Sequence, residues 1–120
     1  MNYKTPQEIA KSAVAAAISK TGLPLLPMAL LGFLAGAYIA MGGYFMIVVT
    51  QDAAAFAGVG ISKFLGGVAF SLGLFLVVAA GGELFTGNCL MPIGLLSRKI
   101  TCGGMLRNLA VVYLANFAGA

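Results

Sequence analysis

The side chains best suited to contact an ion are Glu83, Thr86 and Asn88, which lie together in residues 81–88. A carboxylate accepts hydrogen bonds, whereas a hydroxyl or an amide can both donate and accept them. The same run contains three glycines and is soon followed by Pro92, so a continuous helix is disfavoured and backbone N–H groups are left free. These features predict a site that binds or conducts a small ion.

The composition around this run is that of a protein embedded in lipid. Of the 120 residues, 61% are hydrophobic and 8% are charged, with a net charge of +4, whereas a soluble domain has about 25% charged residues. These values exclude a soluble enzyme, a disordered tail and a disulfide-rich secreted module. Two cysteines without metal-ligand spacing and no histidine give no basis for a metal or cofactor. We expect no enzyme, no cofactor and no nucleic-acid partner.

Uncharged runs predict where the chain crosses the bilayer. The first is 31 residues long and a crossing helix needs about 20, so span one is expected at about 25–49. A weakly polar connection over residues 51–60 leads to a returning segment at about 61–99. That segment is too long for one crossing, which predicts a broken helix with a non-helical loop at about 83–91. Span three is expected from about 103, incomplete at the end of the chain.

The first 22 residues differ from the rest of the chain. Thr5 and Glu8 have capping-box spacing, with Pro6 at the first helical position. We expect residues 1–22 to form a helix on the membrane surface, anchored by its lysines, ahead of a transmembrane half-domain over residues 23–120. Basic residues are concentrated in this segment and near the start of span three, so we expect a cytoplasmic N-terminus.

Span one also carries small residues at every fourth position, namely Gly32, Gly36 and Ala40. Such a face lets a second helix approach closely. It predicts packing, not chemistry.

Glu83 allows two interpretations. An acidic residue inside a membrane is a functional candidate by default, but it could instead cap a half-helix or pair with a base elsewhere in the assembly. The structural role has the same weight as the functional one, because a bare carboxylate facing the pathway would repel an anion. Thr86 and Asn88 can offer uncharged hydrogen bonds to a passing ion. Phe70 and Leu74, one turn apart, could form an apolar constriction, although such pairs more commonly only pack.

Two parts of the chain resemble the formate/nitrite transporter family. The first combines the runs KFLGGVAFSLGL (residues 63–74) and GELFTGN (residues 82–88), and the second is RNLAVVYLANFAGA (residues 107–120). The resemblance covers essentially the whole chain from about residue 5. It implies a homopentameric, multi-pass channel of the inner (plasma) membrane for small monovalent anions, namely formate, nitrite or hydrosulfide.

The resemblance also implies a fold and roles for single residues. The fold is an aquaporin-like channel of six spans, in which two three-span halves form an inverted repeat, each with one broken helix. Phe70 would belong to the outer constriction, and Leu74 and Leu84 to the inner one. Thr86 would lie beside a polar chamber between them, opposite a His from the second half. Phe85 and Asn88 would complete the loop that contacts the substrate.

We therefore expect an all-α membrane protein that forms the N-terminal three-span half of such a channel. Three alternatives differ in class. An aquaporin-like channel for neutral solutes should carry Asn-Pro-Ala loops, which are absent. A small homo-oligomeric drug exporter needs an acid within its first span, and only Asp52 lies near, at the outer end. A membrane anchor subunit of a respiratory complex needs His haem ligands or cysteine clusters.

Overall fold

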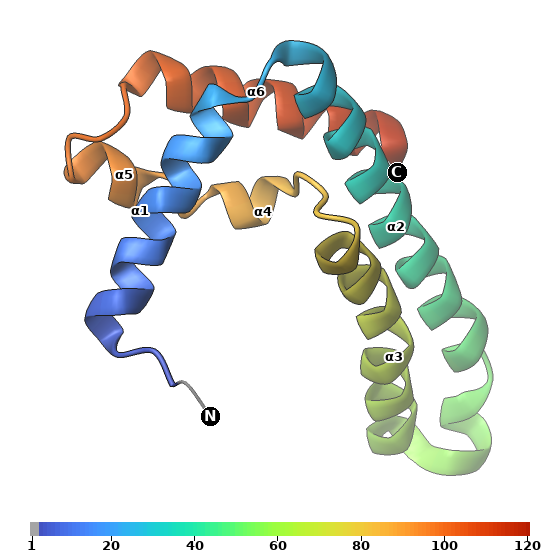
Figure 1. Ribbon diagram of the computed structural model, residues 1–120. Helices are drawn as coiled ribbons and strands as arrows, with labels where there is room; N and C mark the ends of the chain where they lie inside the picture. The colour runs from blue at the N-terminus through green and yellow to red at the C-terminus, as the bar shows by residue number, and fades with distance from the viewer. Residues whose placement is uncertain (1–2) are drawn as a thin grey trace.

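The computed structural model describes residues 3–120, which form helices and no strand. The helices are α1 (Pro6–Gly22), α2 (Leu25–Thr50), α3 (Ala53–Ala79), α4 (Phe85–Asn88), α5 (Pro92–Leu96) and α6 (Cys102–Gly119). α2 and α3 form a long antiparallel hairpin, and the other helices gather at the end of the hairpin away from its tip (Figure 1). The expected all-α class is confirmed.

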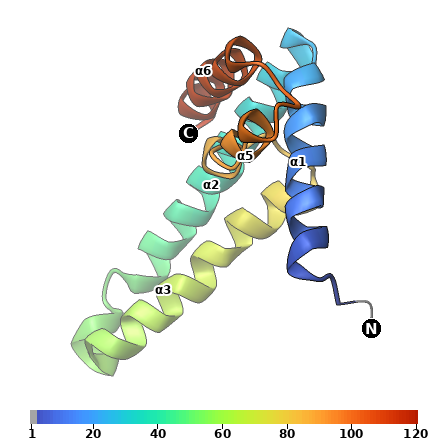
Figure 2. The same ribbon diagram turned by 90° about the vertical axis from the view of Figure 1, so that its left-hand side faces the viewer.

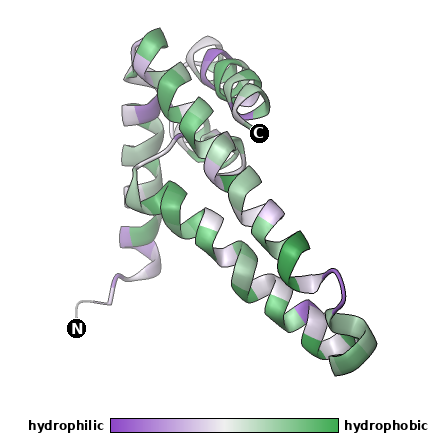
Figure 3. Cartoon of the chain, turned by 90° about the vertical axis from the view of Figure 1, so that its right-hand side faces the viewer, coloured by the Kyte–Doolittle hydropathy of each residue, from purple (hydrophilic) through white to green (hydrophobic). Residues whose placement is uncertain are grey.

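The hairpin contains the two described helices that are long and apolar enough to cross a membrane. Apolar residues dominate both helices, and a polar patch marks the tip that joins them (Figure 3). The two helices come closest where Gly42 faces Gly73. A Cβ added at Gly73 would lie 2.7 Å from the carbonyl oxygen of Tyr38, so only glycine fits this contact.

α6 packs against the N-terminal half of α2 (Figure 1). Gly32 and Gly36 lie at this contact: a Cβ at Gly32 would approach Ala115 to 2.8 Å, and one at Gly36 would overlap the backbone of Asn116. The small-residue face predicted in span one therefore does receive another helix. α6 is 18 residues long and is not one of the two described helices that are long and apolar enough to cross a membrane.

The connection between α2 and α3 differs from the prediction. Residues 51–60 were expected to be a weakly polar connection ahead of a helix starting near residue 61, but α3 begins at Ala53 and continues past a kink at Gly58, where φ is 81°. Ala-rich sequence favours helix, and the positive φ of Gly58, which glycine adopts readily, allows the change of direction within it. The link is therefore reduced to two residues, Gln51 and Asp52.

The returning segment is interrupted between α3 and α4. α3 ends at Ala79, and Gly81 follows with φ of 65°. The loop expected over 83–91 is not wholly irregular, because Phe85–Asn88 form the single helical turn α4. The N–H groups of Asn88 and Cys89 reach the carbonyls of Leu84 and Phe85 at 3.0 Å. A short turn thus replaces the fully non-helical loop.

α1 begins with the predicted capping box. The Thr5 hydroxyl accepts a hydrogen bond from the Glu8 N–H, and the Glu8 carboxylate accepts one from the Thr5 N–H at 2.7 Å. α1 lies beside α5 (Figure 2), where Ala17, 2% exposed, packs on Gly94. Residues 1 and 2 of the expected 1–22 segment lie outside the described residues.

Candidate functional site

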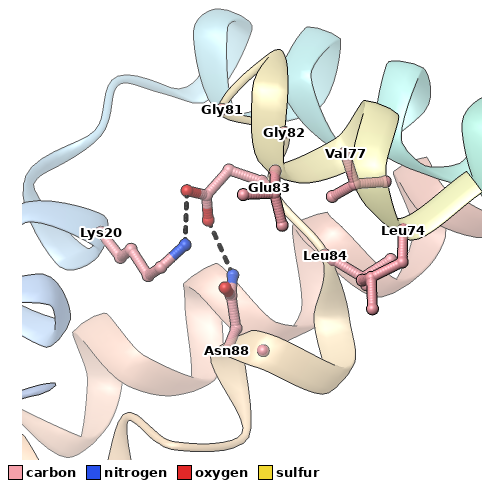
Figure 4. Close-up of a pocket in the computed structure, with 10 residues that line it drawn as sticks. Lys20, Leu74, Val77, Gly81, Gly82, Glu83, Leu84 and Asn88 are labelled. Atoms are coloured by element: carbon pink, nitrogen blue, oxygen red, sulfur yellow. Dashed lines mark hydrogen bonds and ion pairs between the residues drawn. The ribbon is translucent and has the colours of Figure 1, made fainter. Parts of the chain in front are cut away.

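A partly buried ion pair lies where the returning helix is broken. The Lys20 Nζ is 2.7 Å from the Glu83 Oε1, and the Glu83 side chain is 7% exposed. Lys20 comes from the last turn of α1, and Glu83 from the extended residues before α4 (Figure 4). Charges taken out of water must be paired, and this pair leaves the break formally neutral.

Asn88 holds the second oxygen of this carboxylate and is itself bonded to a second asparagine, Asn108. The Asn88 Nδ2 donates to the Glu83 Oε2 at 2.8 Å and to the Asn108 Oδ1 at 2.7 Å. The Asn108 Nδ2 in turn donates to the backbone carbonyl of Lys20 at 3.1 Å. Both asparagines are fully buried. The network closes on itself through α1, the break, α4 and α6, and among the described residues only the Asn88 Oδ1 is a buried polar side-chain atom without a partner.

A third asparagine, Asn116 on α6, ties the broken backbone to α2. Its Nδ2 donates to the carbonyl oxygens of Gly32, at 2.7 Å, and Glu83, at 2.9 Å, and its Oδ1 accepts from the Phe85 N–H at 2.8 Å. A break in a helix leaves such groups without intrahelical partners. One side chain therefore satisfies two carbonyls and one N–H.

A cavity of about 340 Å³ opens beside the ion pair (Figure 4). Its wall is apolar on the α3 side, where Leu74 and Val77 meet Leu84 from the break, and it ends at Lys20 and Glu83. A space of this size fits a small solute. The neutralised pair and the apolar wall together neither attract nor strongly repel a monovalent ion.

The structure brings only some of the predicted site residues to this cavity. Leu74, Glu83, Leu84 and Asn88 line it. Phe70 lies on α3 outside the lining, 36% exposed. Asn88 was expected to contact a passing ion, but its fully buried amide instead serves the Glu83 carboxylate.

The side chains of Phe85 and Thr86 take no part in the hydrogen bonds around the Glu83 carboxylate. The Phe85 ring packs edge-on against Tyr113 of α6, with ring centres 5.3 Å apart at 69°. The two rings line a separate hollow of about 260 Å³. Thr86 is exposed, and its hydroxyl forms no hydrogen bond within residues 3–120.

Sequence reasoning did not find Lys20, Asn108 or Asn116 as site residues. Lys20 was interpreted as a membrane anchor, whereas it is the base that pairs with Glu83. The two asparagines are the uncharged polar exceptions in the apolar stretch after Arg107. Their eight-residue separation is close to two helical turns, a signal that could have placed them on one face.

Comparison with known proteins gives a consistent result. A family model described as "Formate/nitrite transporter" matches residues 7–120. The chain is 44% identical to a probable formate transporter of Methanothermobacter thermautotrophicus over 99% of its own length and 44% of that relative. It is 38% identical to the formate channel BtFdhC of Bacillus thuringiensis, over 100% of this chain and 46% of the relative.

A third relative is the formate channel FocA of Escherichia coli strain K12, which is 35% identical over 96% of this chain and 40% of its own length. The chain therefore spans less than half the length of these curated relatives.

Proposed function

Because this chain belongs to the formate/nitrite transporter family, we propose that it builds part of the pathway of a membrane channel for small monovalent anions. The observation that carries the proposal is the family match over nearly the whole chain, combined with a neutralised polar site at the broken helix. Formate is the first candidate substrate, because the similar relatives are named formate transporters and channels. Nitrite and hydrosulfide, equally small and singly charged, are further candidates.

The ion pair supports anion passage through its charge balance. An unpaired Glu83 would repel an anion, but Lys20 is 2.7 Å away and Asn88 donates to the other oxygen. The cavity wall therefore carries one charge of each sign and no net charge. An anion can therefore approach the site without Glu83 first having to be neutralised by a proton.

We assign Leu74 and Leu84 to one apolar constriction and Phe70 to another. Leu74 and Leu84 face the same cavity from two segments, which supports pairing them, and Phe70 lies about one turn earlier on α3. Apolar rings resist a hydrated ion. The unpaired hydroxyl of Thr86 and the backbone at the break would offset part of the cost of dehydration. Phe85 would position Thr86 through its contact with Tyr113.

The proposed assembly is a homopentamer in the inner membrane, with an aquaporin-like inverted repeat and a cytoplasmic N-terminus. The basic residues of α1 and of the turn before α6 support this orientation. The mass of the detergent-solubilised complex tests the pentamer, and a thiol probe that cannot cross membranes tests the orientation. Cys89 and Cys102 are both free and exposed.

The decisive experiment is flux in proteoliposomes. The full-length protein is reconstituted, and swelling is followed after mixing with sodium formate, nitrite or hydrosulfide, each compared with protein-free vesicles. Faster swelling with formate supports the proposal. Equal permeability to neutral glycerol would favour an aquaporin-like solute channel, and no flux of any solute would favour an anchor subunit.

A further inference from the structure

A second hollow, about 310 Å³ in volume, lies between α1 and the α5 turn, apart from the Glu83 network. Its floor is apolar, formed by Ala10, Val14 and Ile93, and its rim is polar, formed by Lys11, Ser97 and Lys99. We call these six residues the α1–α5 groove. We propose that this groove binds the phosphate headgroup of an anionic phospholipid, with the start of an acyl chain along the apolar floor.

The two lysines on the rim are available for a ligand. Among the described residues the one ion pair joins Lys20 to Glu83, so neither Lys11 nor Lys99 has an acidic partner. Glu8 is the acid nearest to Lys11 in sequence, and its carboxylate accepts hydrogen bonds from the backbone N–H and the hydroxyl of Thr5. Two unpaired ammonium groups and a hydroxyl on one rim complement a phosphate monoanion.

The turn that carries Lys99 has a fixed backbone. Arg98 adopts a left-handed φ of 54°, which no other non-glycine residue among those described does. This lets the Lys99 N–H reach the carbonyl of Gly94 at 2.9 Å and the Arg98 N–H reach that of Leu95 at 2.9 Å. Glycine normally occupies such a helix-ending position. Here an arginine adopts this conformation, directly between the rim residues Ser97 and Lys99 in sequence.

The apolar part of the surface selects a lipid over a soluble phosphate. The floor residues are alkyl, and Leu96, just before the rim residue Ser97, is 84% exposed. An exposed leucine beside cationic groups suits the boundary between headgroups and acyl chains. A soluble anion would use the lysines alone and leave this apolar surface in water. The inference rests on the proposed membrane location but not on anion conduction.

The test measures binding of phosphatidylglycerol and of phosphatidylcholine to the full chain in a neutral detergent, without any flux assay. We expect phosphatidylglycerol to bind more tightly. Lys11→Gln and Lys99→Gln should each weaken its binding about fivefold, and the double variant about 30-fold. Lys63→Gln is the matched control: it removes the same charge near the opposite end of the hairpin and should change nothing.

Several results would overturn the inference. One is equal loss in Lys63→Gln, which would mean that net charge alone drives binding. Another is equal binding of the two lipids. Displacement of phosphatidylglycerol by soluble glycerol phosphate would assign the groove to a free anion. A change in assembled mass without a change in lipid binding would assign it to a protein contact. Because the variants are at exposed positions, an unchanged unfolding temperature should accompany the expected loss.

Discussion

Replacing Lys20 with methionine should destabilise the fold, because it removes the cation from a carboxylate that stays buried. The methionine keeps a similar length and apolar stem, so the substitution mainly deletes the charge. Glu83 would retain its hydrogen bond from Asn88 but lose its only ion-pair partner among the described residues.

The magnitude follows from the geometry of the pair. Opposite charges 2.7 Å apart attract by about 6 kcal/mol at an effective dielectric constant of about 20. Desolvation cancels much of this, and breaking a buried pair costs roughly 3–5 kcal/mol. The Lys20 side chain is 26% exposed, so solvent screens part of the interaction. We therefore expect Lys20→Met to lower the free energy of unfolding by about 3 kcal/mol.

A double-mutant cycle separates this effect from a general loss of packing. Glu83→Gln alone keeps an amide that can still bond to Asn88, and should cost less than Lys20→Met. Adding it to Lys20→Met should recover about 2 kcal/mol, because the unpaired charge is gone. The assay is reversible unfolding in detergent micelles, followed by circular dichroism. A double variant that is no more stable than Lys20→Met alone would refute the idea that the buried charge is the source of the instability.

Four further outcomes are expected. Gly73→Val should lower the free energy of unfolding by about 2 kcal/mol, because a side chain cannot fit beside α2; Gly67→Val, at a position with open space, is the control. Thr86→Val should slow anion flux about 10- to 100-fold, the effect of losing roughly 1.5–3 kcal/mol of hydrogen bonding to a charged group, without lowering stability. Phe70→Ala should raise the leak of larger anions in swelling assays, and unchanged selectivity would leave Phe70 a packing residue. Hydrogen bonds from the Thr5 backbone N–H, and secondly from its hydroxyl, lower the pKa of Glu8 below its ordinary value of 4.5. Protection of the amides at the start of α1 against hydrogen exchange, relative to an unstructured peptide at the same pH, should therefore fall as pH falls through that lowered pKa, and Glu8→Gln should abolish this pH dependence.

Local features of the chain could be predicted from the sequence because their causes are local. The capping box of α1 depends on residues three apart. The interruption after α3 follows from two adjacent glycines, and Gly81 does take a left-handed φ of 65°. Gly32 and Gly36 mark a helix contact by their spacing alone, whichever helix fills it.

The site could be predicted only in part, because its partners are distant in sequence. Lys20 and Glu83 are 63 residues apart, and no pattern along the chain joins them. The sequence left open whether Glu83 contacts the substrate or is paired with a base, and geometry places Lys20 on it. The prediction that residues 83–91 lack helix was wrong because α4 recovers two backbone hydrogen bonds within the break. A short turn provides hydrogen-bond partners for backbone N–H and C=O groups that lipid cannot provide.

The asparagines of α6 explain how a break and a charge can coexist at one place. An interrupted helix exposes backbone groups that a membrane interior does not solvate. Asn116 on α6 binds two of them, the Glu83 carbonyl and the Phe85 N–H, while Asn88, itself bonded to Asn108, donates to the Glu83 carboxylate. Among the buried polar side-chain atoms of residues 3–120, only the Asn88 Oδ1 is left without a partner. On the proposed anion pathway, a small ion at the cavity would meet groups that are already held in place, so its passage need not disturb the Lys20–Glu83 pair.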